Sequence, residues 1–142
     1  MNTMRLWHQK WGALVLIMAL ALVIDGTAVA QDAPDLSTVR DAFVQGDAKM
    51  LLDATGERVE IALMGQGQLY SRAQATYVMQ DFFREHPPVQ FALEPGYGDE
   101  GSWIVAGEYW YRQEDASLQV YIHLRLKDKQ WEVREIRIEP RR

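Results

Sequence analysis

Residues 118–138 read LQVYIHLRLKDKQWEVREIRI, and this stretch decides the fold because it holds two β-strands and the turn between them. Over residues 118–127 aliphatic and polar side chains alternate, which is typical of a strand with one buried face. A two-residue turn at residues 128–129 places Leu126 opposite Trp131 in the second strand. The stretch therefore predicts an antiparallel hairpin with one aliphatic face.

The second strand of this hairpin changes phase part-way along its length. Val133 faces the aliphatic side of the first strand, but Ile136 is out of phase with it. One extra residue near Arg134 and Glu135, a β-bulge, returns Ile136 to the aliphatic face, opposite Ile122. Because a bulge bends its strand, the sequence predicts a curved sheet.

A long helix is expected before the late strands. Ser71 and Gln74 are three residues apart and form the capping-box pattern that opens a helix. Pro87 disfavours helical geometry at His86, so the helix ends there. The apolar stripe of this helix consists of Ala75, Val78, Met79, Phe82 and Phe83. This spacing predicts that the paired phenylalanines face the core.

The remaining predicted elements are short. Apolar spacing indicates a helix over residues 36–45 that Gly46 ends, and Asp47 is the expected N-cap of a second helix that Gly56 terminates. Besides the hairpin strands at residues 118–127 and 131–138, the expected strands are residues 58–63, 69–70, 89–93 and 102–112, with a tight turn at residues 65–68 and a glycine-rich connection at residues 94–101. These elements predict an α+β domain in which a curved antiparallel sheet of about six strands packs on three helices.

The chain is expected to begin with a cleaved leader. Residues 1–30 combine basic residues, an unbroken apolar run at residues 13–24 and an Ala-Val-Ala cleavage pattern at residues 28–30, which is typical of a secretory signal peptide. The run is shorter than the roughly 20 apolar residues that span a bilayer, so no stable membrane anchor is expected. Cleavage before Gln31 predicts an exported protein, periplasmic or extracellular.

Four segments follow from these assignments. They are a signal peptide at residues 1–30, a short tether at residues 31–35, one domain at residues 36–139 and a C-terminal tail at residues 140–142. The chain has no cysteine, so neither a lipid-modified N-terminus nor a disulfide framework is expected.

Charge and composition narrow the function. The chain carries 15 Lys and Arg against 20 Asp and Glu, a formal net charge of −5, and its basic residues cluster only at Arg141 and Arg142. A nucleic-acid footprint is therefore not expected. His86 and His123 lack the spacing of metal ligands, so the sequence predicts neither a metal site nor a cofactor.

The order of elements resembles the cone-shaped nuclear-transport-factor-2-like (cystatin-like) superfamily. Within it, the chain is similar to domain of unknown function 4783, a family of exported bacterial proteins. The likeness covers about residues 35–139 and rests on AFVQGDAKMLLD, YSRAQATYVMQDFF followed by PPVQF, GEYWY and VYIHLRLKDKQWEVREIRIE. The resemblance implies the fold, with the long helix across the mouth of the sheet, and export. It implies no activity and no catalytic residues.

Related cones resemble ketosteroid isomerase and polyketide cyclases, in which a carboxylate or histidine inside an apolar pocket moves protons. The strand at residues 102–112 leaves its phase open. A four-residue loop would pair Tyr111 with Leu118 and turn Glu108 outward, opposite Tyr121, whereas a one-residue slip would aim Glu108 into the cone. The two alternative inward sets are Trp103, Val105, Tyr109 and Tyr111, or Ile104, Ala106 and Trp110. The catalytic candidates are Glu108, Tyr109 and Asp81.

Two surfaces are candidates for binding. The expected pocket for a small apolar ligand is formed by Met79, Phe82, Phe83, Phe91, Tyr109 and Tyr111. The expected face for a homodimer is formed by Glu108, Trp110, Tyr121, His123 and Arg125, where opposite charges interleave. The sequence favours a non-enzymatic binding domain for such a ligand or an envelope protein. The alternatives are a small-molecule isomerase, cyclase or dehydratase, and a purely structural, self-associating component of the cell envelope.

Overall fold

The computed structural model describes residues 32–112 and 117–142, and the predicted signal peptide lies outside them. The three helices of these residues are α1 (Ser37–Gln45), α2 (Ala48–Asp53) and α3 (Arg72–Glu85). The seven strands are β1 (Thr55–Leu63), β2 (Gln66–Ser71), β3 (Pro88–Leu93), β4 (Tyr97–Asp99), β5 (Ser102–Tyr111), β6 (Ser117–Lys127) and β7 (Gln130–Pro140). Among the described residues, no helix is long and apolar enough to cross a membrane.

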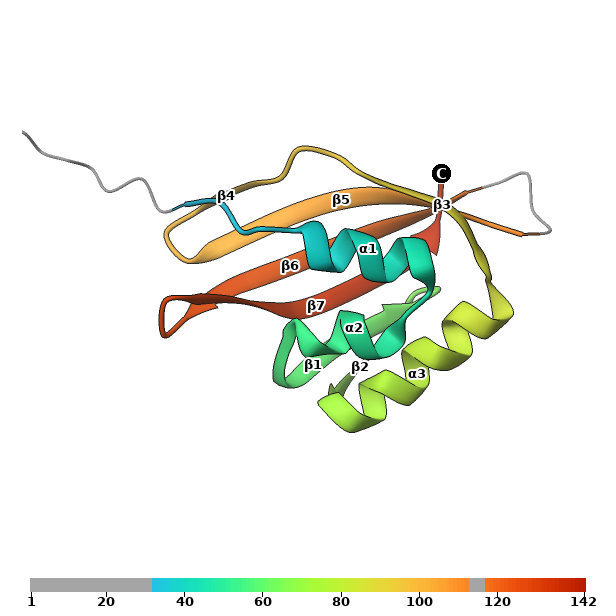
Figure 1. The fold of residues 1–142 in the computed structure, drawn as a ribbon, viewed down its shortest axis with the longest axis horizontal. Helices are drawn as coiled ribbons and strands as arrows, with labels where there is room; N and C mark the ends of the chain where they lie inside the picture. Colours follow the sequence, from blue (N-terminus) through green and yellow to red (C-terminus); the bar gives the residue numbers. More distant parts are fainter. Residues whose placement is uncertain (1–31, 113–116) are drawn as a thin grey trace, which may run out of the picture. The chain divides into compact units, whose positions relative to one another are not determined.

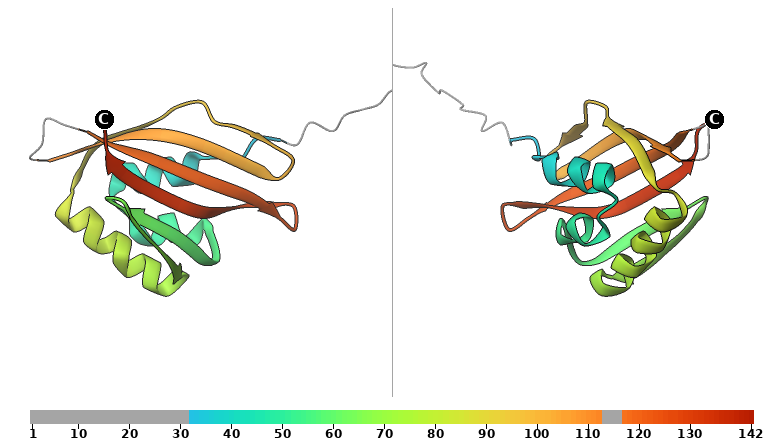
Figure 2. Two further views of the ribbon diagram at one scale, coloured as in Figure 1. Left: turned by 180° about the vertical axis from the view of Figure 1, so that it is seen from behind. Right: turned by 45° about the vertical axis from the view of Figure 1, so that its right-hand side comes forward.

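The strands form one curved, open sheet, and the helices lie on one of its faces (Figures 1 and 2). The strand order is β2-β1-β7-β6-β5-β3, with β4 paired to β5 beside β3. All pairs are antiparallel except β1 with β7, which is parallel. The predicted α+β domain is confirmed, with seven strands rather than about six.

The additional strand, β4, lies in the glycine-rich connection at residues 94–101, where the sequence predicted no strand. Tyr97 pairs with Ile104 of β5. Gly96 and Gly98 allow this backbone to press against Trp103, since a Cβ at Gly98 would lie 2.1 Å from the carbonyl oxygen of Ser102. A three-residue strand with a central glycine has no periodic pattern, which is why the sequence did not reveal it.

The late hairpin has the predicted register. Leu126 faces Trp131, and the two strands remain in step as far as Leu124 opposite Val133. The next pair is His123 with Glu135, so Arg134 is the extra residue of the bulge. The bulge is therefore confirmed at the predicted place.

The register between β5 and β6 differs by two residues from the first of the two alternatives, the one with a four-residue loop. Leu118 pairs with Tyr109 rather than with Tyr111, because the connection between the strands is longer than four residues. Since side chains alternate with a period of two, this even offset gives the same inward and outward faces as that alternative. Tyr109 points inward and Glu108 outward, but Glu108 lies opposite Gln119 rather than Tyr121.

The helix ends follow local chemistry. Asp47 accepts a hydrogen bond from the Met50 amide at 2.9 Å and opens α2. Ser71 and Gln74 form the predicted capping box of α3. Gly46 ends α1 in the left-handed conformation, at φ +66°. These three caps were read correctly from side-chain type alone.

Two predicted boundaries were wrong. Ala54 caps the end of α2, and Gly56 already belongs to β1. The turn before β2 is made by Met64 and Gly65, at φ +52° and +86°, so β2 begins at Gln66 and is longer than expected. A two-residue turn with both φ values positive matches the twist of the flanking strands, which favours the earlier position.

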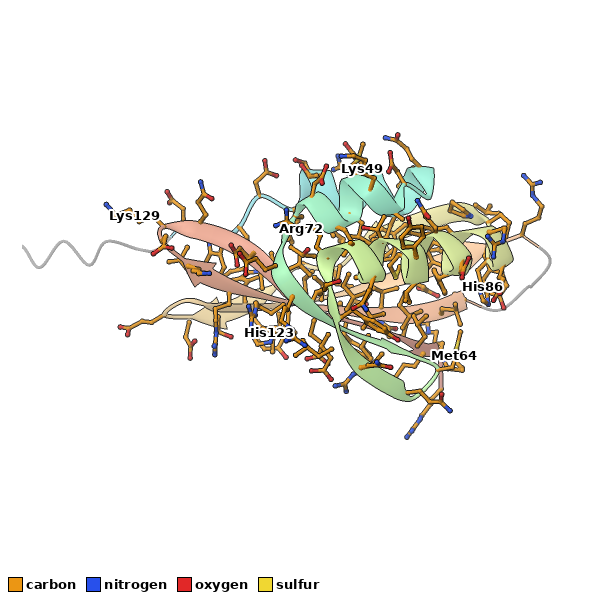
Figure 3. The ribbon with its side chains drawn as sticks, turned by 90° about the horizontal axis from the view of Figure 1, so that it is seen from below. Lys49, Met64, Arg72, His86, His123 and Lys129 are labelled. Carbon is orange, nitrogen blue, oxygen red and sulfur yellow. The ribbon has the colours of Figure 1, made fainter. Side chains whose placement is uncertain are left out.

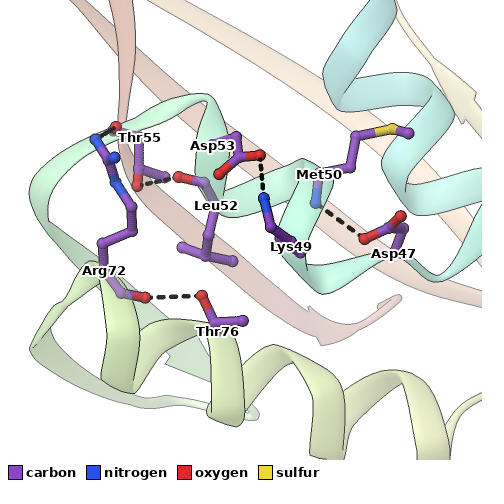
Figure 4. A network of polar contacts seen from close by, with 8 residues as sticks. All are labelled: Asp47, Lys49, Met50, Leu52, Asp53, Thr55, Arg72 and Thr76. Carbon is purple, nitrogen blue, oxygen red and sulfur yellow. Dashed lines mark hydrogen bonds and ion pairs between the residues drawn. The ribbon is translucent and has the colours of Figure 1, made fainter.

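A polar network joins α2, β1 and α3 (Figure 4). The Arg72 guanidinium donates to the carbonyl oxygens of Thr55 and Gly56, at 2.6 Å and 3.2 Å. The Thr55 hydroxyl donates to the Leu52 carbonyl at 2.7 Å, and the Thr76 hydroxyl donates to that of Arg72 at 2.9 Å. These bonds satisfy backbone groups where the chain leaves α2 and where α3 starts.

The core lies between the helices and the inner face of the sheet. Of the α3 stripe, Ala75, Met79, Phe82 and Phe83 are buried and Val78 is half-buried. The sheet contributes Val59, Ile61, Val105, Val120, Ile122, Ile136 and Ile138, each at most 2% exposed. The residues before α1 also reach the domain, since Pro34 is buried and the Asp32 carbonyl accepts a bond from the Trp131 indole.

Candidate functional site

Aromatic rings pack against one another in the interior, among the residues of the predicted ligand pocket. Phe43 stacks on Phe91 with ring centroids 4.5 Å apart, and Phe82 lies 5.5 Å from Tyr109. Five of the predicted pocket residues, Met79, Phe82, Phe83, Phe91 and Tyr109, are at most 6% exposed, while Tyr111 is half-buried. The ring centroids of neighbouring aromatic members lie 5.5 to 6.4 Å apart. These residues form a core cluster, and the hollow described below has other lining residues.

Tyr109 stands at the centre of this cluster. Its side chain is fully buried, and its hydroxyl donates to the backbone carbonyl of His86. Burial raises the pKa of the Tyr109 phenol above its usual value near 10. The hydroxyl is therefore protonated at neutral pH and engaged with the backbone, which suits a structural role better than proton transfer.

His86 completes the cluster at the end of α3, and the sequence reasoning missed this role. Its ring stacks on that of Phe82 and packs edge-on against that of Tyr111, with 4.8 Å between the ring centroids in each pair. Its Nδ1 lies 3.2 Å from the Phe82 carbonyl oxygen. Figure 3 shows His86 and His123 at separate places on the molecule. Among the described residues, no group of three or more His, Asp or Glu side chains is arranged to hold a metal ion.

The three catalytic candidates do not converge. Tyr109 is in the core. Glu108 lies on the outer face, where its carboxylate accepts hydrogen bonds from the Ser117 hydroxyl and the Arg141 guanidinium. Asp81 is on the exposed side of α3 and pairs with Arg84 at 2.6 Å. The structure thus gives each of them a different neighbourhood.

The outer face of the sheet carries a hollow of about 210 Å³. It is lined by Ile104, Tyr121, Ile122, His123, Glu135 and Arg137. His123 Nε2 lies 2.9 Å from the Ser102 hydroxyl, and Glu135 pairs with Arg137 at 2.7 Å. The hollow therefore combines apolar side chains with an ion pair and a histidine.

Exposed apolar side chains adjoin this hollow. Tyr97 is 69% exposed and is the direct cross-strand neighbour of Ile104, which is itself 36% exposed. Ile104 is in turn the neighbour of His123, and Tyr121 is 40% exposed. We call Tyr97, Ile104, Tyr121 and His123 the outer-face patch. The five residues of the predicted dimer face, Glu108, Trp110, Tyr121, His123 and Arg125, alternate with the buried residues of β5 and β6 and lie on this same face.

The curved open sheet, with three helices on its inner face, defines a domain of the nuclear-transport-factor-2-like and cystatin-like class. The model of the domain of unknown function DUF4783 matches residues 36–139, and the chain belongs to this family. A DUF4783 family protein from Bacteroides ovatus is similar with a TM-score of 0.71 and 23% identity, over 79% of this chain and 98% of that one. No match was found among the curated proteins.

Two further solved structures support the fold class. A nuclear-transport-factor-2-like protein of unknown function from Shewanella baltica has a TM-score of 0.59 and 11% identity, over 75% of this chain and 88% of that one. A cystatin-like domain of unknown function from Nostoc punctiforme has a TM-score of 0.58 and 10% identity, over 74% and 72% of the two chains. At such identities the likeness concerns the fold alone.

Proposed function

We propose that this protein is an exported, non-enzymatic interaction domain that associates with a second copy of itself through the outer face of the sheet. The observation that carries the proposal is the outer-face patch, which leaves large apolar side chains in solvent around a hollow. Contiguous apolar surface of this kind is typical of association sites. Export rests on the leader pattern at residues 1–30.

The charges around the patch favour a second copy as the partner. A two-fold contact uses the same surface twice, so the surface has to complement itself. Glu135 and Arg137 place both signs of charge at the hollow, and Arg125 lies opposite Glu132 in the adjoining strands. A two-fold rotation brings carboxylates of one copy near guanidinium groups of the other, while the apolar side chains lose water.

The interior supports a non-enzymatic domain. An isomerase or cyclase of this fold class needs a titratable group that faces a substrate cavity. The titratable side chain at the centre of this interior is Tyr109, which is packed between rings and held protonated. The geometry therefore favours the outer face of the sheet, rather than the interior, as the binding surface.

Sedimentation of a protein that starts at Gln31 tests the proposal. We expect a dimer at micromolar concentrations. Tyr121→Glu places a charge in the patch and should yield a monomer with an unchanged melting temperature. Tyr77→Glu is the matched control, since Tyr77 is 71% exposed on α3, away from the sheet's outer face. A wild-type monomer at high micromolar concentration, or equal dissociation by both variants, would contradict the proposal.

A further inference from the structure

We infer that His123 makes self-association through the outer-face patch sensitive to pH, so that protonation of His123 dissociates the dimer. This inference rests on the proposed function, because it concerns the regulation of the same patch. Histidine is the side chain whose charge ordinarily changes between pH 5 and 8. His123 belongs to the patch and also lines the hollow beside it.

His123 lies in a row of side chains that crosses the outer face of the sheet. Within this row, Tyr97 of β4 is opposite Ile104 of β5, and Ile104 is opposite His123 of β6. On the other side of His123 the row continues with Glu135 of β7. Residues directly opposite each other in neighbouring strands point to the same face. His123 therefore stands at the boundary between the apolar part of the patch and the charged side chains of β7.

The His123 ring accommodates either charge state in the monomer. Its Nε2 lies 2.9 Å from the Ser102 hydroxyl oxygen. A hydroxyl group can donate to a neutral imidazole or accept from an imidazolium. Because His123 is only half-buried, water also reaches the ring. The monomer can therefore take up a proton at His123 without losing this hydrogen bond.

Charges of both signs surround His123, and the nearest carboxylate is already paired. Glu135, the cross-strand neighbour, is bonded to Arg137 at 2.7 Å. Glu60 of β1 lies opposite Glu135, and Arg125 follows His123 by two residues on the same face of β6. The other titratable groups of the adjoining strands are Tyr97, Asp99, Tyr121, Glu132 and Arg134. Since the Glu135 carboxylate is paired with a guanidinium, water is the main support for a charged ring.

Association through the patch removes this support. A second copy that covers Tyr97, Ile104 and Tyr121 also takes water from the ring that lies beside them. Loss of water disfavours the charged form of an ionisable group. A two-fold contact uses the same surface of both copies, so two imidazolium groups would enter one interface. Both effects favour the neutral ring in the dimer.

The direction of the pH dependence follows from linkage. A dimer that binds fewer protons than two monomers is favoured where histidine is neutral, and it is weakened as the pH falls. If the proton affinity of each ring differs about tenfold between the two states, two rings weaken association by up to about 100-fold. We therefore expect the dissociation constant of the dimer to rise at least about tenfold from pH 8 to pH 5.5, where ordinary carboxyl groups stay ionised.

Sedimentation equilibrium at pH 8 and at pH 5.5, on the protein that starts at Gln31, tests the inference. His123→Gln keeps an amide that can bond to Ser102 but cannot titrate, so its dissociation constant should be the same at both pH values. His123→Lys carries a permanent charge and should dimerise weakly at both. His86→Gln is the matched control, since His86 lies at the end of α3, and it should keep the wild-type response.

The outcomes separate this inference from the proposed self-association. A wild-type dimer with one dissociation constant at both pH values, or a His123→Gln protein that responds to pH as the wild type does, would overturn the inference alone. A His123→Lys dimer as tight as the wild-type dimer at pH 8 would do the same. A wild-type monomer at both pH values would contradict self-association and the inference with it. Circular dichroism at both pH values checks the fold, and a response that comes from unfolding at pH 5.5 would also overturn the inference.

Discussion

Tyr109→Phe separates a structural role of the buried tyrosine from a chemical one. The change keeps the ring among Phe43, Phe82 and Phe91 and removes the hydroxyl that donates to the His86 carbonyl. Loss of one buried hydrogen bond is expected to lower the free energy of unfolding by about 1 kcal/mol at neutral pH.

At alkaline pH the wild-type protein should become less stable than Tyr109→Phe. Because the folded-state pKa of Tyr109 is raised, its stabilising contribution is complete below about pH 10 and is lost as the pH rises further. In that range the unfolded chain releases a proton that the folded chain keeps, so wild-type stability falls by about 1.4 kcal/mol per pH unit. Tyr109→Phe lacks this contribution, so the curves of unfolding free energy against pH for the two proteins should cross at about pH 11.

Urea unfolding followed by circular dichroism at a series of pH values measures both curves. The other tyrosines are common to the two proteins, so the difference between the curves isolates Tyr109. Curves that stay parallel above pH 10 would refute the reasoning, since the phenol would then titrate in the folded state as it does in the unfolded one.

Three further predictions concern the helices and the leader. Phe82→Ala should destabilise the protein by about 3–5 kcal/mol, because Phe82 is 3% exposed. Ser71→Ala should destabilise it by about 0.5–2 kcal/mol through the lost cap. Equally small shifts of the denaturation midpoint in both variants would contradict the role of α3 in closing the core. Gly46→Ala should cost about 1–2 kcal/mol in thermal unfolding, since φ is +66° and the added Cβ would lie 3.2 Å from the Pro88 ring; an unchanged melting temperature would argue against this strain. Mass spectrometry of the protein from its source cell should find an N-terminus at Gln31, and an intact leader would contradict cleavage.

Local patterns in the sequence were enough for much of the fold. Alternation and turn length give the register of β6 with β7, and a count of inward residues gives the bulge at Arg134. The capping box of α3 depends on two side chains three residues apart. Each of these features is decided by neighbours along the chain, which is why the sequence is sufficient.

Contacts between distant segments were beyond such reasoning. The parallel pairing of β1 with β7, and thus the position of β2 at the edge, depends on strand order rather than on local periodicity. Phe43 of α1 and His86 at the end of α3 pack against rings of the predicted pocket, and spacing along the chain does not reveal such contacts. The sequence left the face of Glu108 open, and its partner Arg141 follows the last strand.

The central claim is that the outer-face patch lies at a two-fold contact. The chain has no cysteine, so Tyr121→Cys introduces a single thiol, with Tyr77→Cys on α3 as the matched control. Residues close to a two-fold axis approach their own copies, and mild oxidation should then link the Tyr121→Cys protein into a disulfide dimer rapidly, with reversal by reductant. Non-reducing electrophoresis over time gives the two rates. The account predicts much faster linking for Tyr121→Cys, and equal rates for the two variants would contradict it.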